Sequence, residues 1–289
     1  MHPDQLPLSL STVRGLIAEQ FPQWRELPVR ELDPGTVNAV FRIGDDLVAR
    51  FPLQRGQESQ LRAEADAAAR LAVHTRFSVP RPVAFGSPGP GYPLPWSVLR
   101  WVPGTVASEA VAGSVAFAGD LAELIADVRG IPTGGGSFGG TGRGGRIATH
   151  DAWIETCFER STELLDVPRL RRLWTRMREL PRGDAADVTN HGDLMPGNVL
   201  VTGGRLTGVL DVGGLGPADP ALDLVGAWHL LDAAPRAVLR SRLGCGEAEW
   251  ERGRAWAFVQ AMGLVWYYRD SNPTMSRIGR TTLSRILAA

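Results

Sequence analysis

The segment 189–211 holds the residues best suited to chemistry in this chain, because two carboxylates and an amide lie close together in it. Asp193 precedes Asn198 by five positions, and Asp211 follows Asn198 by thirteen. Carboxylate and amide oxygens suit Mg²⁺, a hard cation that takes a few protein oxygens and completes its coordination shell with substrate phosphates and water. We predict that Asn198 and Asp211 bind Mg²⁺ and that Asp193 orients a nucleophile.

Two short apolar runs, residues 199–201 and 206–210, lie between the amide and the second carboxylate, separated by a Gly-Gly pair. This pattern predicts a β-hairpin, in which a tight turn joins two antiparallel strands. Because a hairpin folds back on itself, Asp211 is expected to return close to Asn198.

Asp, Asn, Gly and Pro are also the ordinary residues of turns, so each of these side chains taken singly is as readily a turn former as a ligand. Their order is more informative. Protein kinases place a catalytic aspartate before a metal-binding asparagine in one loop, with a second metal-binding aspartate at the end of a following hairpin. The motif H-G-D-x-x-x-x-N, beginning at His191, and the later L-D-V-G, which contains Asp211, follow that order. The combined pattern favours phosphoryl transfer.

In this pattern Asp193 occupies the position of the base, so His191 is expected to organise the loop backbone rather than to carry a proton. Asp193 would orient the acceptor hydroxyl and finally accept its proton. A weak base suffices, because phosphoryl transfer depends mainly on positioning and charge stabilisation. Val212 stands where protein kinases have a phenylalanine, so a kinase-like in/out switch is not expected here.

The segments HGDLMPGNVLV and GVLDVGGLGPADPALDLVGAW resemble the aminoglycoside phosphotransferase family, small-molecule kinases related in fold to protein kinases. The segments LDPGTVNAVFRIGDDLVARFP and GYPLPWSVLRWVPG resemble the same family, so the resemblance extends through most of the chain. It implies a two-lobed α+β fold, with an antiparallel sheet and a helix in the N-terminal lobe and a mainly helical C-terminal lobe. It also implies transfer of the γ-phosphoryl group of ATP or GTP to a hydroxyl of a small molecule. An aminoglycoside antibiotic is the first acceptor that the resemblance suggests.

The element pattern fits this organisation. Turn signals and apolar periodicity predict strands at 29–32, 40–43, 47–51, 78–85 and 92–101, and helices at 10–21, 57–73, 111–128, 149–165 (capped by Thr149), 169–179, 225–231, 234–243, 247–269 and 274–287. We expect a nucleotide-binding lobe at 1–102 and a catalytic and acceptor-binding lobe at 103–289. By resemblance, backbone groups of Arg100, Trp101 and Val102 would meet the edge of the nucleotide base.

A kinase needs a cation on the third strand of its sheet to hold the phosphates, normally a lysine paired with a helix glutamate. This chain contains no lysine, and all 31 basic residues are arginine. Arg50, in the predicted strand 47–51, would take this position. Glu64 is its expected partner, with Glu58 as the competitor. Arginine grips phosphate or carboxylate through two parallel hydrogen bonds, but it is larger than lysine. The alternative is a surface arginine on an edge strand.

Two glycine-containing segments each allow two interpretations. The turn DPGTVN, residues 33–38, is either a phosphate-covering loop or a plain hairpin turn. Residues 134–145, GGGSFGGTGRGG, form either a flexible surface linker or a mobile substrate-side loop whose arginines and aromatic ring contact the acceptor. His150 could touch substrate, but its place at a predicted helix start favours a structural role.

Asp219 is predicted to cap a helix that has Pro220 at its first position. Asp223 lies four residues further on, on the same predicted helix face. The two could form a catalytic carboxylate pair, but capping and bracing of the catalytic loop is the favoured interpretation. A set of large aromatic side chains in the predicted helices 225–231 and 247–269 either lines an acceptor pocket or belongs to the core: Trp228, Trp256, Trp266, Tyr267 and Tyr268.

Composition argues against several other classes of protein. The 31 basic and 31 acidic residues cancel, so no global field attracts nucleic acid or an anionic membrane. Cys157 and Cys245 lie far apart, without the spacing of a zinc site or a disulfide framework. The N-terminus has no basic region followed by an apolar core, and no run of eighteen uncharged apolar residues occurs. We therefore expect a cytoplasmic enzyme that binds a nucleoside triphosphate and a small-molecule hydroxyl acceptor.

Two alternatives to an aminoglycoside kinase stay open. One is a macrolide kinase or a kinase of a metabolite alcohol or sugar, because aminoglycosides are polycations and the sequence beyond Asp223 is not notably acidic. The other is a catalytically silent kinase-like nucleotide-binding protein, which the missing lysine suggests. The complete set of Asp193, Asn198 and Asp211 argues against it. An α/β hydrolase has little support, because no G-x-S-x-G motif is present.

Overall fold

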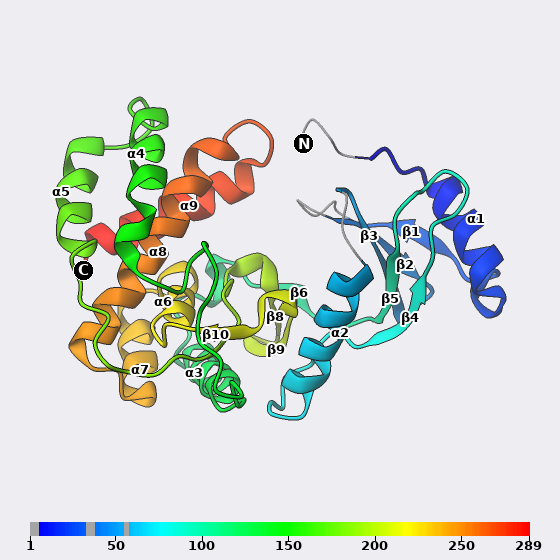
Figure 1. The fold of residues 1–289 in the computed structure, drawn as a ribbon, viewed down its shortest axis with the longest axis horizontal. Helices are drawn as coiled ribbons and strands as arrows, with labels where there is room; N and C mark the ends of the chain where they lie inside the picture. Colours follow the sequence, from blue (N-terminus) through cyan, green and yellow to red (C-terminus); the bar gives the residue numbers. More distant parts are fainter. Residues whose placement is uncertain (1–5, 33–37, 55–57) are drawn as a thin grey trace. The chain divides into compact units, whose positions relative to one another are not determined.

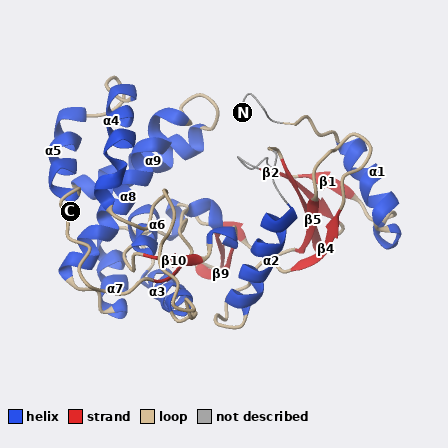
Figure 2. Cartoon of the chain, in the orientation of Figure 1, coloured by secondary structure: helices blue, strands red, loops and turns tan. Residues whose placement is uncertain are grey.

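The computed structural model describes residues 6–32, 38–54 and 58–289, and the chain divides into two compact units (Figure 1). The first unit comprises Met1–Ala72 and Ser78–Pro103, and the second comprises Val73–Phe77 and Gly104–Ala289. Strands make up much of the first unit and helices most of the second (Figure 2). The predicted α+β class, with an N-terminal antiparallel sheet and a mainly helical remainder, is confirmed.

The first unit is built on a five-stranded antiparallel sheet whose strands follow the order β1-β2-β3-β5-β4. The strands are β1 (Val29–Glu31), β2 (Asn38–Ile43), β3 (Leu47–Pro52), β4 (Pro82–Gly86) and β5 (Trp96–Arg100). Two helices belong to this unit, α1 (Leu10–Gln20) and α2 (Glu58–Ala72), with a 3₁₀ turn at Pro22–Trp24.

The core of this sheet is aromatic. The ring of Phe51 stacks on Trp96 at a centroid distance of 4.6 Å and meets Phe41 and Tyr92 edge-on. Such pairs stabilise a core beyond the area that they bury. The indole of Trp96 fits over Gly86, where an added Cβ would lie 2.0 Å from the ring. The alternation of apolar residues in β2 and β3 therefore supplies a rigid platform for the polar side chains of the same strands.

The second unit is mainly helical. Its helices are α3 (Val115–Arg129), α4 (Asp151–Arg160), α5 (Val167–Met177), α6 (Val225–Leu230), α7 (Ala233–Leu243), α8 (Glu247–Tyr267) and α9 (Pro273–Leu287). Helix α8 is buried on most of its circumference, and it packs along α9 and against α4 and α6. It therefore forms the centre of this unit.

Short strands carry the predicted chemical segment. The strands β6 (Thr105–Val106), β8 (Val199–Thr202) and β9 (Arg205–Val209) form one antiparallel sheet, and β7 (Val188–Asn190) pairs with β10 (Gly216–Ala218). Single 3₁₀ turns lie at Pro196–Asn198 before β8, at Val212–Gly214 between β9 and β10, and at Leu222–Leu224 after β10. Two earlier turns, at Glu109–Val111 and Ile147–His150, lie between β6 and β7.

The predicted helix 149–165 is wrong at both ends. Helix α4 spans Asp151–Arg160 and follows a 3₁₀ turn, and Thr149 does not cap it. The Thr149 hydroxyl instead donates to the carbonyl oxygen of Arg146 at 2.6 Å. A threonine hydroxyl that bonds its own local backbone competes with helix capping in this way. Within the described ranges, no helix is both long enough and apolar enough to span a membrane.

Replacing Gly279 with alanine is expected to lower the free energy of unfolding by about 1–3 kcal/mol, because overpacking forces shifts in a close-packed core. The new methyl would lie 2.8 Å from the Ala261 carbonyl oxygen and 3.0 Å from the Leu264 Cβ, where α9 meets α8. Urea unfolding measures the change. The control is Gly113→Ala in the same unit, where an added Cβ meets nothing within 4 Å. A Gly279→Ala protein as stable as this control would contradict the close approach of the two helices.

Candidate active site

The predicted hairpin is present and brings the two ends of the chemical segment together. Strands β8 and β9 are antiparallel, and Gly203 and Gly204 between them have positive φ angles of 58° and 75°. A side chain is strained at such angles, so a glycine pair suits this turn. Beyond β9, the Leu210 N–H donates to the Asn198 carbonyl oxygen at 2.8 Å. The chain therefore returns to Asn198 immediately before Asp211, as predicted.

Asp211 has a left-handed backbone, with φ 55° and ψ 56°. Among the described residues it is the one non-glycine residue with a positive φ. Such a conformation costs on the order of 1–3 kcal/mol and persists only where the surrounding structure determines it. Here the buried side chain of Val212 follows directly. The backbone strain of this unit thus falls on a residue predicted to bind metal.

Asp193 and Asn198 are in direct contact. The Asn198 amide nitrogen Nδ2 donates to the Asp193 carboxylate oxygen Oδ2 at 2.8 Å and to its carbonyl oxygen at 2.9 Å. Within the described part of the chain, nothing donates to the other end of the amide, Oδ1 of Asn198. The amide thus orients the carboxylate with its nitrogen and keeps an oxygen for a cation.

Two further donors meet the other oxygen of the Asp193 carboxylate. Oδ1 accepts hydrogen bonds from Gln260 Nε2 of α8 and from an Arg143 guanidinium nitrogen, the latter at 3.2 Å. The Asp193 side chain remains 34% exposed, so the carboxylate is oriented by the protein and still accessible to a ligand. The sequence analysis did not identify Gln260, because 67 residues separate it from Asp193 and no local pattern marks it.

The turn that carries Asp193 is fixed by a buried carboxylate. The backbone N–H groups of His191 and Gly192 donate to the two oxygens of Asp223 at 2.7 and 2.8 Å. Asp223 is fully buried. Burial raises the pKa of the Asp223 carboxyl, while the nearby His191 ring and these two backbone donors oppose the rise. Asp223 therefore contacts the turn that carries Asp193 from the protein interior, and is not exposed at the surface.

His191 links the same turn to the end of β9. Its ring nitrogen Nδ1 accepts from the Asp193 backbone N–H at 3.3 Å, which leaves Nε2 to donate to the Leu210 carbonyl oxygen at 2.9 Å. The ring is buried. His191 thus ties the loop of Asp193 to the residue before Asp211 with both of its nitrogens, and neither is left for proton transfer.

The prediction of a helix starting at Pro220 is wrong, but Asp219 does make a cap-like local bond, because its Oδ1 accepts from the Ala221 N–H at 2.9 Å. The first helical turn after it is the 3₁₀ turn Leu222–Leu224, and α6 begins only at Val225. Asp219 is fully buried, and its two oxygens accept from the Arg252 guanidinium at 2.9 and 3.0 Å. Because Asp219 points to α8 while Asp223 binds the catalytic turn, the two do not share a helix face. Residue spacing could not reveal Arg252, which lies 33 positions away.

The glycine-rich segment 134–145 is bound to the catalytic segment. The Phe138 N–H donates to the Asp187 carboxylate at 2.7 Å, and the Gly144 carbonyl oxygen accepts from the Asp219 N–H at 2.8 Å. Its Arg143 forms the ion pair with Asp193. A free linker would make no such contacts, so the interpretation as a plain flexible linker is wrong.

Asp193 and Asp211 line one pocket of about 330 Å³. The rest of its lining comes from the glycine-rich segment, the catalytic turn and β10: Phe138, Arg143, Asn190, His191, Gly192, Gly214, Gly216, Pro217, Ala218 and Leu222. The two carboxylates singled out in the sequence thus face a common space with an arginine and an aromatic ring at its wall. His150 is not part of this lining, and burial lowers the pKa of its ring.

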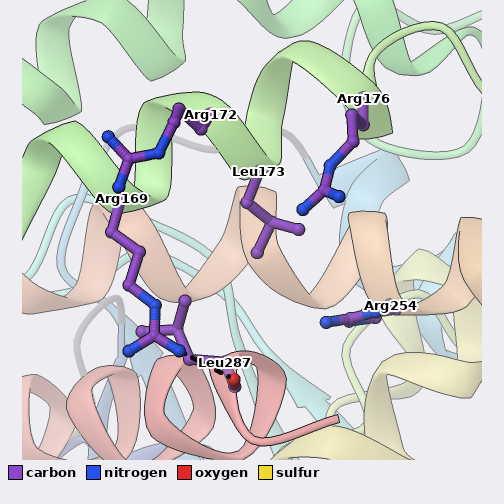
Figure 3. Close-up of a pocket in the computed structure, with 6 residues that line it drawn as sticks. All are labelled: Arg169, Arg172, Leu173, Arg176, Arg254 and Leu287. Atoms are coloured by element: carbon purple, nitrogen blue, oxygen red, sulfur yellow. Dashed lines mark hydrogen bonds between the residues drawn. The ribbon is translucent and has the colours of Figure 1, made fainter.

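A second pocket, of about 290 Å³, lies between α5, α8 and α9 (Figure 3). Its lining is Arg169, Arg172, Leu173, Arg176, Arg254 and Leu287. No carboxylate lines it among the residues that the structure describes. It is therefore unsuited to Mg²⁺, and the pocket beside Asp193 is the candidate active site.

In the first unit, Arg50 lies on β3, which β2 and β5 flank on both sides. The alternative that placed it on an edge strand is wrong. Its guanidinium forms an ion pair with the Glu64 carboxylate of α2. The side chain of Glu58, the competing partner, and the predicted turn over residues 33–37 lie outside the described residues.

Three residues are expected to meet the edge of a nucleotide base. Arg100 is the last residue of β5, and Trp101 and Val102 follow it. The Arg100 N–H donates to the Arg81 carbonyl oxygen at 2.7 Å, and the Trp101 N–H donates to the Asp46 carbonyl oxygen at 2.8 Å. Both groups are therefore used within the sheet. The side chain of Val102 is buried.

The chain was compared with known proteins. A family model described as the phosphotransferase enzyme family matches residues 28–256. A search of the curated proteins found no match.

Solved structures share the fold over nearly the whole chain. The GDP complex of aminoglycoside 2'-phosphotransferase-IIIa has a TM-score of 0.71 and 20% identity, covering 97% of this chain and 99% of that one. Macrolide 2'-phosphotransferase MphH from Brachybacterium faecium has a TM-score of 0.61 and 19% identity, with coverage of 96% and 98%. The streptomycin, ATP and APH(2")-IIa ternary complex has a TM-score of 0.60 and 15% identity, with coverage of 98% and 97%. At these identities the likeness establishes the fold.

Replacing Asp223 with alanine is expected to destabilise the second unit by about 2–4 kcal/mol, because two buried N–H groups lose their acceptor. Amide hydrogen exchange at His191 and Gly192 should accelerate more than elsewhere in the unit. Chemical unfolding with mass-resolved exchange measures both effects. Asp184→Ala, which removes an exposed carboxylate before β7, is the control and should change neither. If amide exchange at His191 and Gly192 is unaltered in the Asp223 variant, Asp223 does not hold the turn that carries Asp193.

Proposed function

This chain belongs to the phosphotransferase enzyme family, and we propose that it moves the γ-phosphoryl group of ATP or GTP to a hydroxyl of a small molecule. One observation carries the proposal: Asp193 and Asp211 line a single pocket, and Asn198 is hydrogen-bonded to Asp193 beside it. This is the set of side chains that phosphoryl transfer requires, namely a group to orient the nucleophile and oxygen ligands for the metal.

Asp193 is the proposed catalytic residue. A carboxylate whose two oxygens are held by Asn198 and Gln260 has a fixed direction for accepting a hydrogen bond from the acceptor hydroxyl. That bond orients the hydroxyl toward the γ-phosphoryl group. Asp193 takes the hydroxyl proton as the new O–P bond forms, while the bond from γ-phosphorus to the bridging oxygen breaks and the nucleoside diphosphate leaves. Most of the rate acceleration in such reactions comes from positioning and from charge stabilisation.

Asn198 and Asp211 are the proposed ligands of Mg²⁺. The donor set fits the ion, because an amide oxygen without a described donor and a carboxylate are both hard oxygen ligands. The backbone bond between Leu210 and Asn198 keeps their two positions together. Mg²⁺ bound there would neutralise charge on the nucleotide phosphates.

For the nucleotide, we propose Arg50 as the cation that contacts phosphate, with Glu64 holding its guanidinium in place. We also propose that the base edge is met by backbone groups at the end of β5. Since the N–H groups of Arg100 and Trp101 bond within the sheet, the Trp101 carbonyl and the Val102 N–H are the groups proposed for this contact. Related structures are complexes with GDP and with ATP, so either donor fits.

An aminoglycoside is the first acceptor to test, because the similar structures include aminoglycoside phosphotransferases. A macrolide or a metabolite alcohol or sugar is the second, and a specific observation favours it. Phe138 forms part of the pocket wall, and an aromatic ring suits an acceptor that is less charged than an aminoglycoside. A catalytically silent nucleotide-binding protein is the remaining alternative, and it would bind ATP or GTP without Mg²⁺-dependent turnover.

Asp193→Asn is expected to reduce phosphoryl transfer by roughly 10²–10⁴-fold, the range for removal of a positioned acid–base group, and to leave nucleotide affinity nearly unchanged. The assay follows Mg²⁺-dependent consumption of ATP and GTP against aminoglycosides, macrolides and small alcohols, and measures product mass. A gain of one phosphoryl group on one class identifies the acceptor. Asp184→Asn is the matched control. Unchanged turnover in Asp193→Asn would rule out the proposed mechanism.

A further inference from the structure

Behind Asp193, a line of polar side chains extends into the helical interior of the second unit. Gln260 of α8 donates from Nε2 to Asp193 Oδ1, and its Oε1 lies 3.1 Å from Nε2 of His229 on α6. The other ring nitrogen of His229, Nδ1, lies 2.8 Å from the hydroxyl oxygen of Thr282 on α9. Three helices thus each supply one member of a continuous hydrogen-bond chain that ends on the proposed catalytic carboxylate.

Chemistry fixes the direction of every bond in this chain. A carboxylate that accepts from Gln260 requires the amide nitrogen to face Asp193, and the amide oxygen then faces His229. An amide oxygen only accepts, so the proton of the ring must be on Nε2. In a neutral ring Nδ1 is then an acceptor, and Thr282 donates to it. The order of donors is Thr282 to His229, His229 to Gln260, and Gln260 to Asp193.

The surroundings of His229 keep its ring neutral. Its side chain is 2% exposed, and Thr282 is fully buried. The pKa of His229 is lowered to about 4, mainly by burial and also by the charges of Arg143 and Arg285, while the Gln260 bond and the Asp193 charge oppose the shift. At neutral pH a single ring proton is present, as the bond directions require.

We propose that Gln260, His229 and Thr282 are positioning residues, which hold the Asp193 carboxylate in one rotational state through a hydrogen-bond chain of fixed direction. None of the three lines the pocket beside Asp193, so they act through that carboxylate and not on a substrate. The kinetic part of this inference rests on the proposed phosphotransferase function. The bond directions do not depend on it.

A matched pair of variants at one site tests the chain. The side-chain nitrogen of glutamine reaches the position of a histidine Nε2, while that of asparagine is one carbon shorter. His229→Gln should keep the donor to Gln260 and retain kcat within about threefold. His229→Asn should lower kcat by roughly 10–100-fold, the effect of a small misplacement of a catalytic group, with the nucleotide KM unchanged. Equal kcat values in two folded variants would overturn the proposal.

Nuclear magnetic resonance of the ¹⁵N-labelled wild-type ring gives a readout that needs no turnover. We expect the neutral Nε2–H tautomer at pH 7 and titration of His229 near pH 4. Thr282→Val, which removes only the hydroxyl donor, should shift the Nδ1 resonance and leave the proton on Nε2. The Nδ1–H tautomer or a doubly protonated ring at pH 7 would overturn the chain of bonds. If the tautomer is as expected but wild-type protein transfers no phosphoryl group, the proposed function fails and the chain stands.

The arginine-lined pocket of Figure 3 supports an independent inference. Arg169, Arg172 and Arg176 recur along α5 at three- and four-residue spacing, which places them on one helix face, and Arg254 reaches the pocket from α8 (Figure 3). The chain as a whole has zero formal net charge. This concentration of positive charge is therefore local.

Two of these arginines lack the partners that their neighbours have. Arg171 pairs with Glu155 and Arg178 pairs with Asp151, and both carboxylates belong to α4. Arg172 and Arg176 make no hydrogen bond or ion pair with any residue in the described ranges. The guanidinium of Arg254 pairs with Glu251 at 3.2 Å and donates to the Ile286 carbonyl oxygen at 2.6 Å, while its buried Nε has no hydrogen-bond partner in the described ranges. A guanidinium group can bind a phosphate group through two parallel N–H···O hydrogen bonds.

We infer that this pocket binds a phosphate-bearing anion. Isothermal titration of inorganic pyrophosphate into the Arg50→Gln protein, with Mg²⁺ absent so that the proposed phosphate contacts of the active site are removed, should show one site. The double variant Arg172→Gln and Arg176→Gln should weaken binding at least tenfold. Arg171→Gln and Arg178→Gln together remove the same charge from α5 and the residue that ends it, and should leave the affinity within about threefold. Equal loss in the two double variants, or no loss in either, would identify an adventitious ion only and overturn the inference.

Discussion

The buried carboxylate of Asp223 is the interaction on which the candidate site depends. It accepts the backbone N–H groups of His191 and Gly192, and so fixes the turn that presents Asp193. An ionisable group without water is stabilised only when its hydrogen bonds are made. The turn and the carboxylate therefore require one another. His191 extends the same constraint to the end of β9, which brings Asp211 and Asn198 into a common framework.

One face of α8 supports this framework from behind. Three residues at four-residue spacing on this face, Arg252, Trp256 and Gln260, each donate to a buried or partly buried aspartate of the site. The first two hold Asp219, and the third holds Asp193. Because α8 is buried at the centre of its unit, these donors cannot move independently of the core. The exposed carboxylate of the site is thereby supported by a rigid, buried helix.

Local patterns predicted well what depends on neighbouring residues. The hairpin of β8 and β9 follows from two apolar runs and a Gly-Gly turn, and it returns the chain to Asn198 as predicted. Errors and open alternatives arose where distant partners mattered. Asp219 keeps a local bond to the Ala221 N–H, but the helix predicted after it starts later, and its carboxylate also binds the distant Arg252 in the core. For Arg50, only the pairing of β3 with β5 excluded the alternative of an edge strand.

By itself, the sequence determined the order and spacing of Asp193, Asn198 and Asp211 and the pairing of Arg50 with Glu64, because these follow from residue type and spacing. The α+β class was implied by the family resemblance. Only the tertiary structure decided which side chains surround the Asp193 carboxylate. Arg143 lies 50 residues and Gln260 lies 67 residues from Asp193 along the chain, and His229 lies 31 residues from Gln260. Their bonds form only when helices and loops pack, and no short-range periodicity encodes which distant donor a buried acceptor will meet.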